Sequence, residues 1–192
     1  MTNLLVRVVL PLVAGGALLA GCTSTQEGTA SPVQSSSAGE SGAPETSSSS
    51  SGGGGTASIT DPCSLLEMGD LSSYGTFNEP DVKTLGGART CSYRKKIASA
   101  SEKSIVVGAN VRDAASVDQI NDTGGGIVDR DINGRKAKEA SGGSIASCTL
   151  ALPVGDSSRV DVVVLADESA EVSCQIAEAV AKAAVEPRLP KG

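Results

Sequence analysis

Residues 145–187 read IASCTLALPVGDSSRVDVVVLADESAEVSCQIAEAVAKAAVEP, and the pattern of this segment predicts the fold class. Two segments rich in apolar residues, 145–153 and 159–165, flank a turn-forming sequence at 155–158. This pattern predicts an antiparallel β-hairpin. In its first strand, alternate residues share a face, and one such face holds small and apolar residues: Ala146, Cys148, Leu150 and Leu152.

The rest of the stretch predicts a helix over roughly 171–186. Apolar residues recur at the spacing of one helical face: Val172, Ile176, Val180, Ala183 and Ala184. Pro187 ends this helix because proline has no backbone N–H to donate. The apolar face most simply covers one face of the hairpin's sheet. We therefore expect an α+β fold, in which an antiparallel β-sheet is covered by a C-terminal helix.

Upstream segments extend the sheet. Alternating or continuous apolar patterns predict four further strands, over 89–97, 103–111, 127–132 and 135–140. The last two flank Asn133-Gly134, the strongest short signal for a hairpin turn.

Short helices are expected outside these strands. Asp61 can cap a helix whose first residue is Pro62, and Gly69 ends this N-terminal helix. A second short helix is expected over 114–120, whereas residues 70–88 show no regular pattern.

The N-terminus predicts a lipoprotein signal peptide over residues 1–21. Arg7 precedes an apolar run that is too short and too interrupted by glycine for a good membrane-spanning helix. The run ends in Leu19-Ala20-Gly21-Cys22, which matches the lipobox of bacterial lipoproteins. We expect cleavage between Gly21 and Cys22 and acylation of Cys22, palmitate included. An uncleaved N-terminal anchor is the alternative.

Residues 22–58 predict the lipidated cysteine and a disordered tether. From Thr23 to Ser58 the chain holds 12 Ser, 7 Gly and 5 Thr, which leaves little apolar surface to offset the entropy of ordering. Such a tether would let the domain at 59–192 move through an envelope layer while it stays anchored to the cell membrane.

The charge and composition of the chain limit the classes of molecule that it is expected to bind. The formal net charge is -6, and residues 59–192 keep 15 of the 16 basic and 19 of the 22 acidic residues. A mildly acidic domain repels polyphosphates, so no nucleic-acid partner is expected. With one Phe, two Tyr and no Trp, the core must come from aliphatic residues, which makes covalent cross-links more useful.

Four cysteines remain once Cys22 carries lipid, namely Cys63, Cys91, Cys148 and Cys174. An even number in an exported chain predicts two disulfides. A zinc site is one alternative, but no pair has C-x-x-C spacing and the chain has no His. Free buried thiols are the other. Of three possible connectivities we favour Cys63–Cys91 and Cys148–Cys174, because each joins a helix near a domain end to a strand.

No catalytic site is predicted. The absence of His excludes Ser-His-Asp and Cys-His catalysis. Ser92 and Lys95 match the S-x-x-K motif, but on a strand they point to opposite faces and the partner motifs are missing. Asp129 and Asp131 share one face of a strand, where Arg135, Lys136 and Lys138 across the hairpin are expected to pair with them. No metal and no cofactor are expected.

The cysteine pattern resembles an actinobacterial lipoprotein family of unknown function. The resemblance covers about residues 59–190 and rests on four stretches: Asp61-Pro62-Cys63-Ser64-Leu65-Leu66, Cys91-Ser92-Tyr93, Cys148, and Cys174-Gln175-Ile176-Ala177 leading to Leu189-Pro190. Tyr93 stands where the family more often has Trp. The resemblance implies an envelope lipoprotein and brings no active site.

These observations favour a membrane-anchored, extracytoplasmic, non-catalytic binding or interaction module, with an envelope protein as a possible partner. Two alternatives remain open. The domain could carry an apolar ligand in a cleft between sheet and helix lined by Val, Ile and Ala. Less favoured is a hydrolase that uses carboxylates such as Asp129 and Asp131.

Overall fold

A computed structural model describes residues 55–142 and 145–191 of the 192-residue chain. The predicted signal peptide, Cys22 and most of the predicted tether lie outside these residues. No helix within the described ranges is long and apolar enough to cross a membrane.

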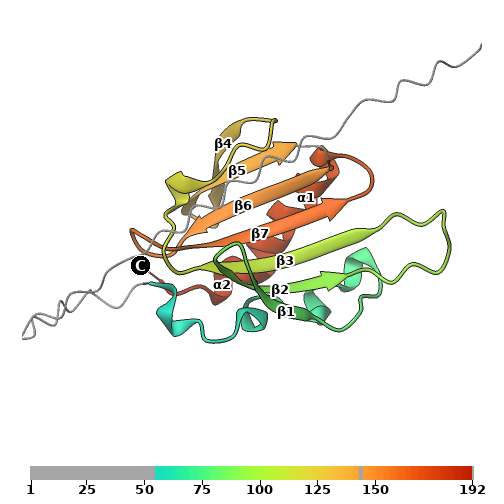
Figure 1. Cartoon of the computed structure of the whole chain (residues 1–192), viewed down its shortest axis with the longest axis horizontal. Helices are drawn as coiled ribbons and strands as arrows, with labels where there is room; N and C mark the ends of the chain where they lie inside the picture. Colours follow the sequence, from blue (N-terminus) through green and yellow to red (C-terminus); the bar gives the residue numbers. More distant parts are fainter. Residues whose placement is uncertain (1–54, 143–144, 192) are drawn as a thin grey trace, which may run out of the picture. The chain divides into compact units, whose positions relative to one another are not determined.

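The described residues form one seven-stranded antiparallel sheet in the order β1-β2-β3-β7-β6-β5-β4 (Figure 1). The strands are β1 (Asp81–Leu85), β2 (Ala88–Arg94), β3 (Ile105–Arg112), β4 (Ile127–Ile132), β5 (Arg135–Gly142), β6 (Ser147–Pro153) and β7 (Arg159–Ala166). Both predicted hairpins are present, and the expected α+β fold is confirmed. β1 at one edge was not predicted.

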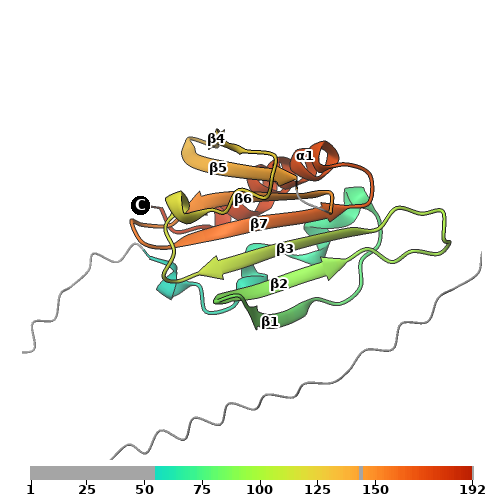
Figure 2. The same cartoon turned by 45° about the horizontal axis from the view of Figure 1, so that its top comes forward.

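One face of the sheet, which we call the covered face, packs against the helices. Tyr93, Val107, Val164 and Cys148 are aligned on it across β2, β3, β7 and β6. All four are buried, and Cys148 is bonded to the helix α1 (Ala170–Val180). Figures 1 and 2 show α1 behind the sheet at the level of β5 to β7. The core lies between this helix and the sheet, and consists mainly of Val, Leu, Ile and Ala.

The opposite face, which we call the open face, is only partly covered. The segment after β3 contains a short 3-10 turn, η4 (Val117–Gln119), in place of the expected longer helix. Ile120 and Val117 of this segment pack on Ala140 and Ala151 of β5 and β6. The rest of the open face, over β2, β3 and β7, carries half-buried side chains together with the buried polar residues Thr90, Arg159 and Asp161.

Two disulfides link the helical segments to the sheet. Cys63–Cys91 joins the 3-10 turn η2 (Pro62–Leu65) to β2, and Cys148–Cys174 joins β6 to α1. The predicted pairing is confirmed, and the zinc and free-thiol alternatives are overturned because all four sulfur atoms are bonded in pairs. Each disulfide holds one helical segment on the covered face.

The C-terminal helix departs from the predicted regular α-helix. α1 is followed by a π-turn, η5 (Ala181–Val185), and a last turn, α2 (Glu186–Arg188), which contains Pro187. The helix therefore does not end before Pro187. A wider turn accommodates the proline ring, which in an α-helix would clash with the carbonyl four residues earlier. Four residues of the predicted apolar stripe are buried or half-buried, whereas Ala183 is exposed.

The N-terminal segment also differs from its prediction. Asp61 caps η2 as expected, through a 2.8 Å bond from the backbone N–H of Cys63. Gly69 does not end a helix, however, because it lies inside a second 3-10 helix, η3 (Met68–Tyr74). A further 3-10 turn, η1 (Thr56–Ser58), precedes the predicted domain boundary at Ile59, and Thr56 is only 2% exposed. The folded part therefore begins before Ile59.

Candidate functional site

A groove of about 650 Å³ lies between α1 and the β4–β5 hairpin. We call it the helix groove. Its sheet side is formed by Arg130, Glu139 and Ser141. Its helix side is formed by residues of α1 and the π-turn: Ala170, Glu171, Cys174, Gln175, Glu178, Ala179 and Lys182. This volume lies within the range of pockets that hold small molecules.

Arg130 connects the two walls of the helix groove. Its guanidinium makes two bonds with the Glu139 carboxylate, 2.8 Å from Nη2 and 3.3 Å from Nε. The same Nε lies 3.0 Å from Oε1 of Glu178 on α1. Because the side chain of Glu139 is only 5% exposed, its charge depends on Arg130 for compensation. The arginine thus fixes the distance between hairpin and helix.

The electrostatics of the helix groove follow from its ion pairs. Lys182, one turn further along, lies 2.9 Å from Glu178. Lys182, followed by Arg130, lowers the pKa of Glu178, while Glu139 raises the pKa of Arg130. Glu171 has no ion-pair partner among the described residues and is exposed. Three carboxylates against two cations leave the groove with an excess of one negative charge.

Glu139 also lies beside the Cys148–Cys174 disulfide. One carboxylate oxygen and the two sulfur atoms lie within 4.8 Å of one another, an arrangement close enough for three metal ligands. Cysteine binds metals as a thiolate, however, and both sulfur atoms are here bonded to each other. In the disulfide form this cluster therefore does not offer a metal site.

A second, smaller hollow of about 270 Å³ lies on the open face, between β1 and β7. Gly108 forms part of its lining, where a Cβ atom would come within 3.2 Å of the Cys91 carbonyl oxygen. Val106, Val163 and Leu165 add apolar surface, and charged side chains of β1 and β2 surround it. Its lining also includes Asp81, Lys83 and Ser92, but Lys83 pairs with Asp81 and the Ser92 hydroxyl faces the Asp81 carbonyl.

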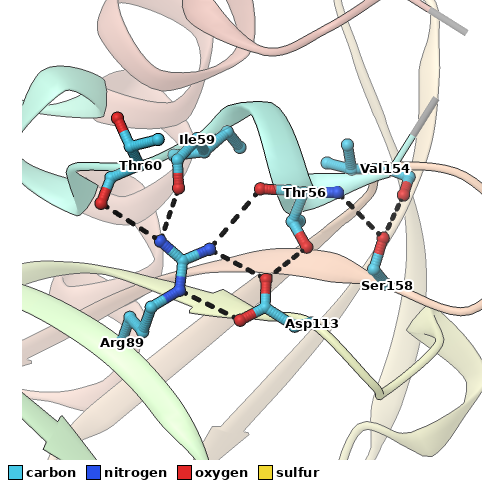
Figure 3. A network of polar contacts seen from close by, with 7 residues as sticks. All are labelled: Thr56, Ile59, Thr60, Arg89, Asp113, Val154 and Ser158. Atoms are coloured by element: carbon cyan, nitrogen blue, oxygen red, sulfur yellow. Dashed lines mark hydrogen bonds and ion pairs between the residues drawn. The ribbon is translucent and has the colours of Figure 1, made fainter. Parts of the chain in front are cut away.

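Figure 3 shows a polar network around Arg89, near the start of β2. The guanidinium binds both carboxylate oxygens of Asp113, at 3.0 Å from Nε and 2.8 Å from Nη2. It also donates to the carbonyls of Thr56, Ile59 and Thr60. Arg89 lowers the pKa of Asp113, with the Thr56 hydroxyl as the second cause. All donors of this guanidinium point at the protein itself, so the network is structural.

The acids singled out from the sequence lie on the surface. Asp129 is 88% exposed and lies 3.4 Å from Lys138, while Asp131 lies 2.9 Å from Lys136 and accepts from the backbone N–H of Gly134. The predicted pairing is confirmed for Lys136 and Lys138 but not for Arg135, which pairs with Glu186. These carboxylates do not converge on a pocket.

The S-x-x-K residues are also placed as the strand pattern predicts. Ser92 lies on β2 and its hydroxyl faces the Asp81 carbonyl at 3.5 Å. Lys95 follows the end of β2, where its side chain packs near Gly75. Neither residue lies on a helix. The predicted lipidation site Cys22 and its neighbour Gly21 lie outside the described residues.

Sequence reasoning missed the residues that shape the helix groove. Arg130 and Glu139 look like ordinary surface charges in the sequence. The hairpin register contained a usable signal, because Asn133-Gly134 aligns Arg130 with Ala137 and so brings Glu139 two residues further along the same face. The burial of Glu139 beneath α1 depends on the packing of the helix and could not be inferred from the strand alone.

Comparison with known protein families identifies the family of this chain. Residues 17–187 match the model of a family described as protein of unknown function, DUF3558. This chain belongs to the DUF3558 family. No curated protein and no solved structure matches the chain significantly. The family therefore confirms the coarser part of the predicted resemblance and supplies no activity, so the function must be argued from this chain.

Proposed function

We propose that this DUF3558 protein is a lipid-anchored, extracytoplasmic binding module whose recognition site is the helix groove. The anchor is proposed from the sequence Leu19-Ala20-Gly21-Cys22 and the Ser/Gly/Thr-rich stretch that follows it. The protein acts by binding a partner and does not turn over a substrate.

We place the recognition site in the helix groove because of one observation, the arrangement of its charged side chains. Arg130 and Lys182 are both paired with carboxylates, whereas Glu171 at the groove wall has no ion-pair partner among the described residues. A cationic group on a partner, such as a lysine or arginine side chain, would complete this pairing. The disulfide and the Arg130 bridge hold both walls in place before binding, which reduces the entropy lost on association.

The same lining bears on the alternatives. A carrier of an apolar ligand was expected to have a cleft lined by Val, Ile and Ala, and the cleft at this position has five charged side chains and neither Val nor Ile in its lining. A carboxylate hydrolase requires two acids that converge on a substrate. Asp129 and Asp131 are exposed and paired with lysines. Two of the acids that share the helix groove are held in ion pairs, Glu139 by Arg130 and Glu178 by Arg130 and Lys182. These observations support binding over either alternative.

The proposal is tested with a trilysine peptide as probe and a triglutamate peptide as control. Backbone amide NMR shifts of the folded domain are followed during titration. Trilysine should shift the amides of Glu171, Gln175 and Ser141 in a saturable manner, and triglutamate should not.

Charge-matched variants separate recognition from general attraction to an acidic protein. Glu171→Gln should weaken trilysine binding several-fold, whereas Glu102→Gln, which removes the same charge far from the groove, should leave it unchanged. Equal effects of the two variants, or shifts spread over the whole surface, would show that the helix groove is not a recognition site.

A further inference from the structure

Residues 55–60, which we call the strap, are held on the domain by a set of polar contacts and by one buried apolar side chain. The Thr56 hydroxyl donates a 2.6 Å bond to Asp113, and the Thr56 N–H donates a 3.3 Å bond to the Ser158 hydroxyl. The Arg89 guanidinium donates hydrogen bonds to three backbone carbonyls of the strap (Figure 3). Its apolar contribution comes from Ile59, which is 6% exposed.

The strap depends on one side chain. Arg89 contacts both ends of the strap and, through Asp113, also positions the acceptor of the Thr56 hydroxyl. The 3-10 turn η1 is only three residues long and cannot persist without these contacts. A hollow of about 450 Å³ lies beside the strap and is lined by Thr56, Ile59, Arg89, Asp113 and Ser158.

The chain beyond the strap is fixed independently. Pro62 is buried, Asp61 caps η2, and Cys63 is covalently joined to Cys91. Loss of the strap contacts would therefore free the chain up to about residue 60 and stop at the disulfide. The sheet would stay paired during this opening, and the core would lose one side chain, that of Ile59.

We propose that the strap opens and closes as a unit governed by Arg89, while the Cys63–Cys91 disulfide is a fixed stop. In the proposed lipid-anchored protein the strap lies where the tether joins the domain, so its opening lengthens the tether by about six residues, or ~20 Å at full extension. This functional meaning rests on the proposed anchor; the opening itself does not. The device changes how far the domain reaches from the membrane without unfolding it.

Hydrogen exchange of the mature full-length chain tests this inference. The amides of Thr56 and Ile59 report the strap, since they donate to Ser158 and to the Thr56 carbonyl, and amides of β3 and β7 report the core. Strap amides should exchange faster than core amides in the wild-type chain. Arg89→Lys should accelerate strap exchange a further ~10- to 100-fold, because lysine cannot reproduce the planar set of donors.

Two further variants keep the test decisive. Arg94→Lys, on the same strand but exposed, should leave both sets of amides unchanged. Thr56→Val removes only the hydroxyl bond to Asp113 and should accelerate strap exchange less than Arg89→Lys does.

The opposite result would be that strap and core amides exchange at the same rate in the wild-type chain, or that Arg89→Lys accelerates both equally. Either outcome would mean that the strap opens only when the domain unfolds. The measurement is repeated with Cys22→Ser, which removes the proposed lipidation site. Strap exchange should be the same in this variant, so the proposed opening is tested separately from the proposed anchor.

Discussion

The side-chain amide of Asn133 donates a 2.9 Å hydrogen bond to the backbone carbonyl of Lys182. In a regular α-helix this carbonyl would accept from the N–H of Glu186. Here the Glu186 N–H donates to Ala181 instead, as part of the π-turn that precedes Pro187. The β4–β5 turn therefore satisfies a carbonyl that the helix leaves free, and holds the hairpin against the helix end.

Replacing Asn133 by glycine tests this contact. Asn133 has a positive φ of 54°, which glycine adopts without strain, so Asn133→Gly removes the side-chain bonds and keeps the turn. We expect the free energy of unfolding to fall by about 1 kcal/mol, measured by urea denaturation. Asn121→Gly, at an exposed loop position, should have a smaller effect. Equal effects of the two variants would contradict a specific role of the Asn133 amide.

The two disulfides should each be essential to a domain with so few aromatic residues. Replacing Cys63 and Cys91 by Ala, or Cys148 and Cys174 by Ala, should cost about 2–5 kcal/mol of stability. Alkylation of the folded wild-type domain without reductant should label no thiol. Peptide mapping that recovered Cys63 linked to Cys148 or Cys174 would contradict the pairing.

Acid should destabilise the domain through its arginine-paired carboxylates. The pKa of Asp70 is lowered chiefly by its hydrogen bond from Arg188, and that of Asp113 chiefly by Arg89. A carboxylate whose pKa is lower in the folded state stabilises the fold at pH values above its ordinary pKa, which is 3.8 for both residues. This contribution is lost as the pH falls through the folded-state pKa.

Stability should therefore change little between pH 7 and about pH 5 and decline steeply below about pH 4. Thermal melts across this range would measure the decline. Asp70→Asn should flatten it, because asparagine does not titrate. A stability that rose on acidification would contradict the assignment of these ion pairs.

Asp129 and Asp131 should be dispensable. Both carboxylates are exposed and pair only with exposed or half-buried lysines, interactions that contribute little to stability. The double variant Asp129→Asn/Asp131→Asn should melt within about 2 °C of the wild-type domain and keep trilysine binding. Loss of a hydrolytic activity in this variant, in a screen of ester, peptide, glycoside and phosphate substrates, would instead support the hydrolase alternative.

The sequence was sufficient to predict elements with a one-sided apolar pattern. The hairpin over 145–165 and the helix from 171 have this property, and both are present. The turn at Asn133-Gly134 was predicted instead from the preference of these two residues for tight hairpin turns, and it is present as well. The strand β1 was missed because all five of its residues are exposed, so burial leaves no alternation to recognise. The helix groove was missed because its charged residues acquire their meaning only when α1 packs over β5.

The cysteine pairing was predictable for a different reason. Cys63 and Cys174 lie in helical segments, Cys91 and Cys148 lie in strands, and the nearest pairs join one to the other. By contrast, the π-turn at 181–185 could not be predicted from its own sequence. It leaves the Lys182 carbonyl without its helical partner, and this carbonyl accepts instead from Asn133 in the β4–β5 hairpin.

Mass spectrometry of the mature N-terminal peptide tests whether this protein is an exported binding domain anchored by lipid. We expect a peptide that begins at Cys22 and carries a diacylglyceryl group on its thiol. We also expect that Cys22→Ala moves the protein out of the detergent phase or leaves its signal peptide uncut. A mature wild-type chain with an unmodified Cys22 would contradict the proposed anchor.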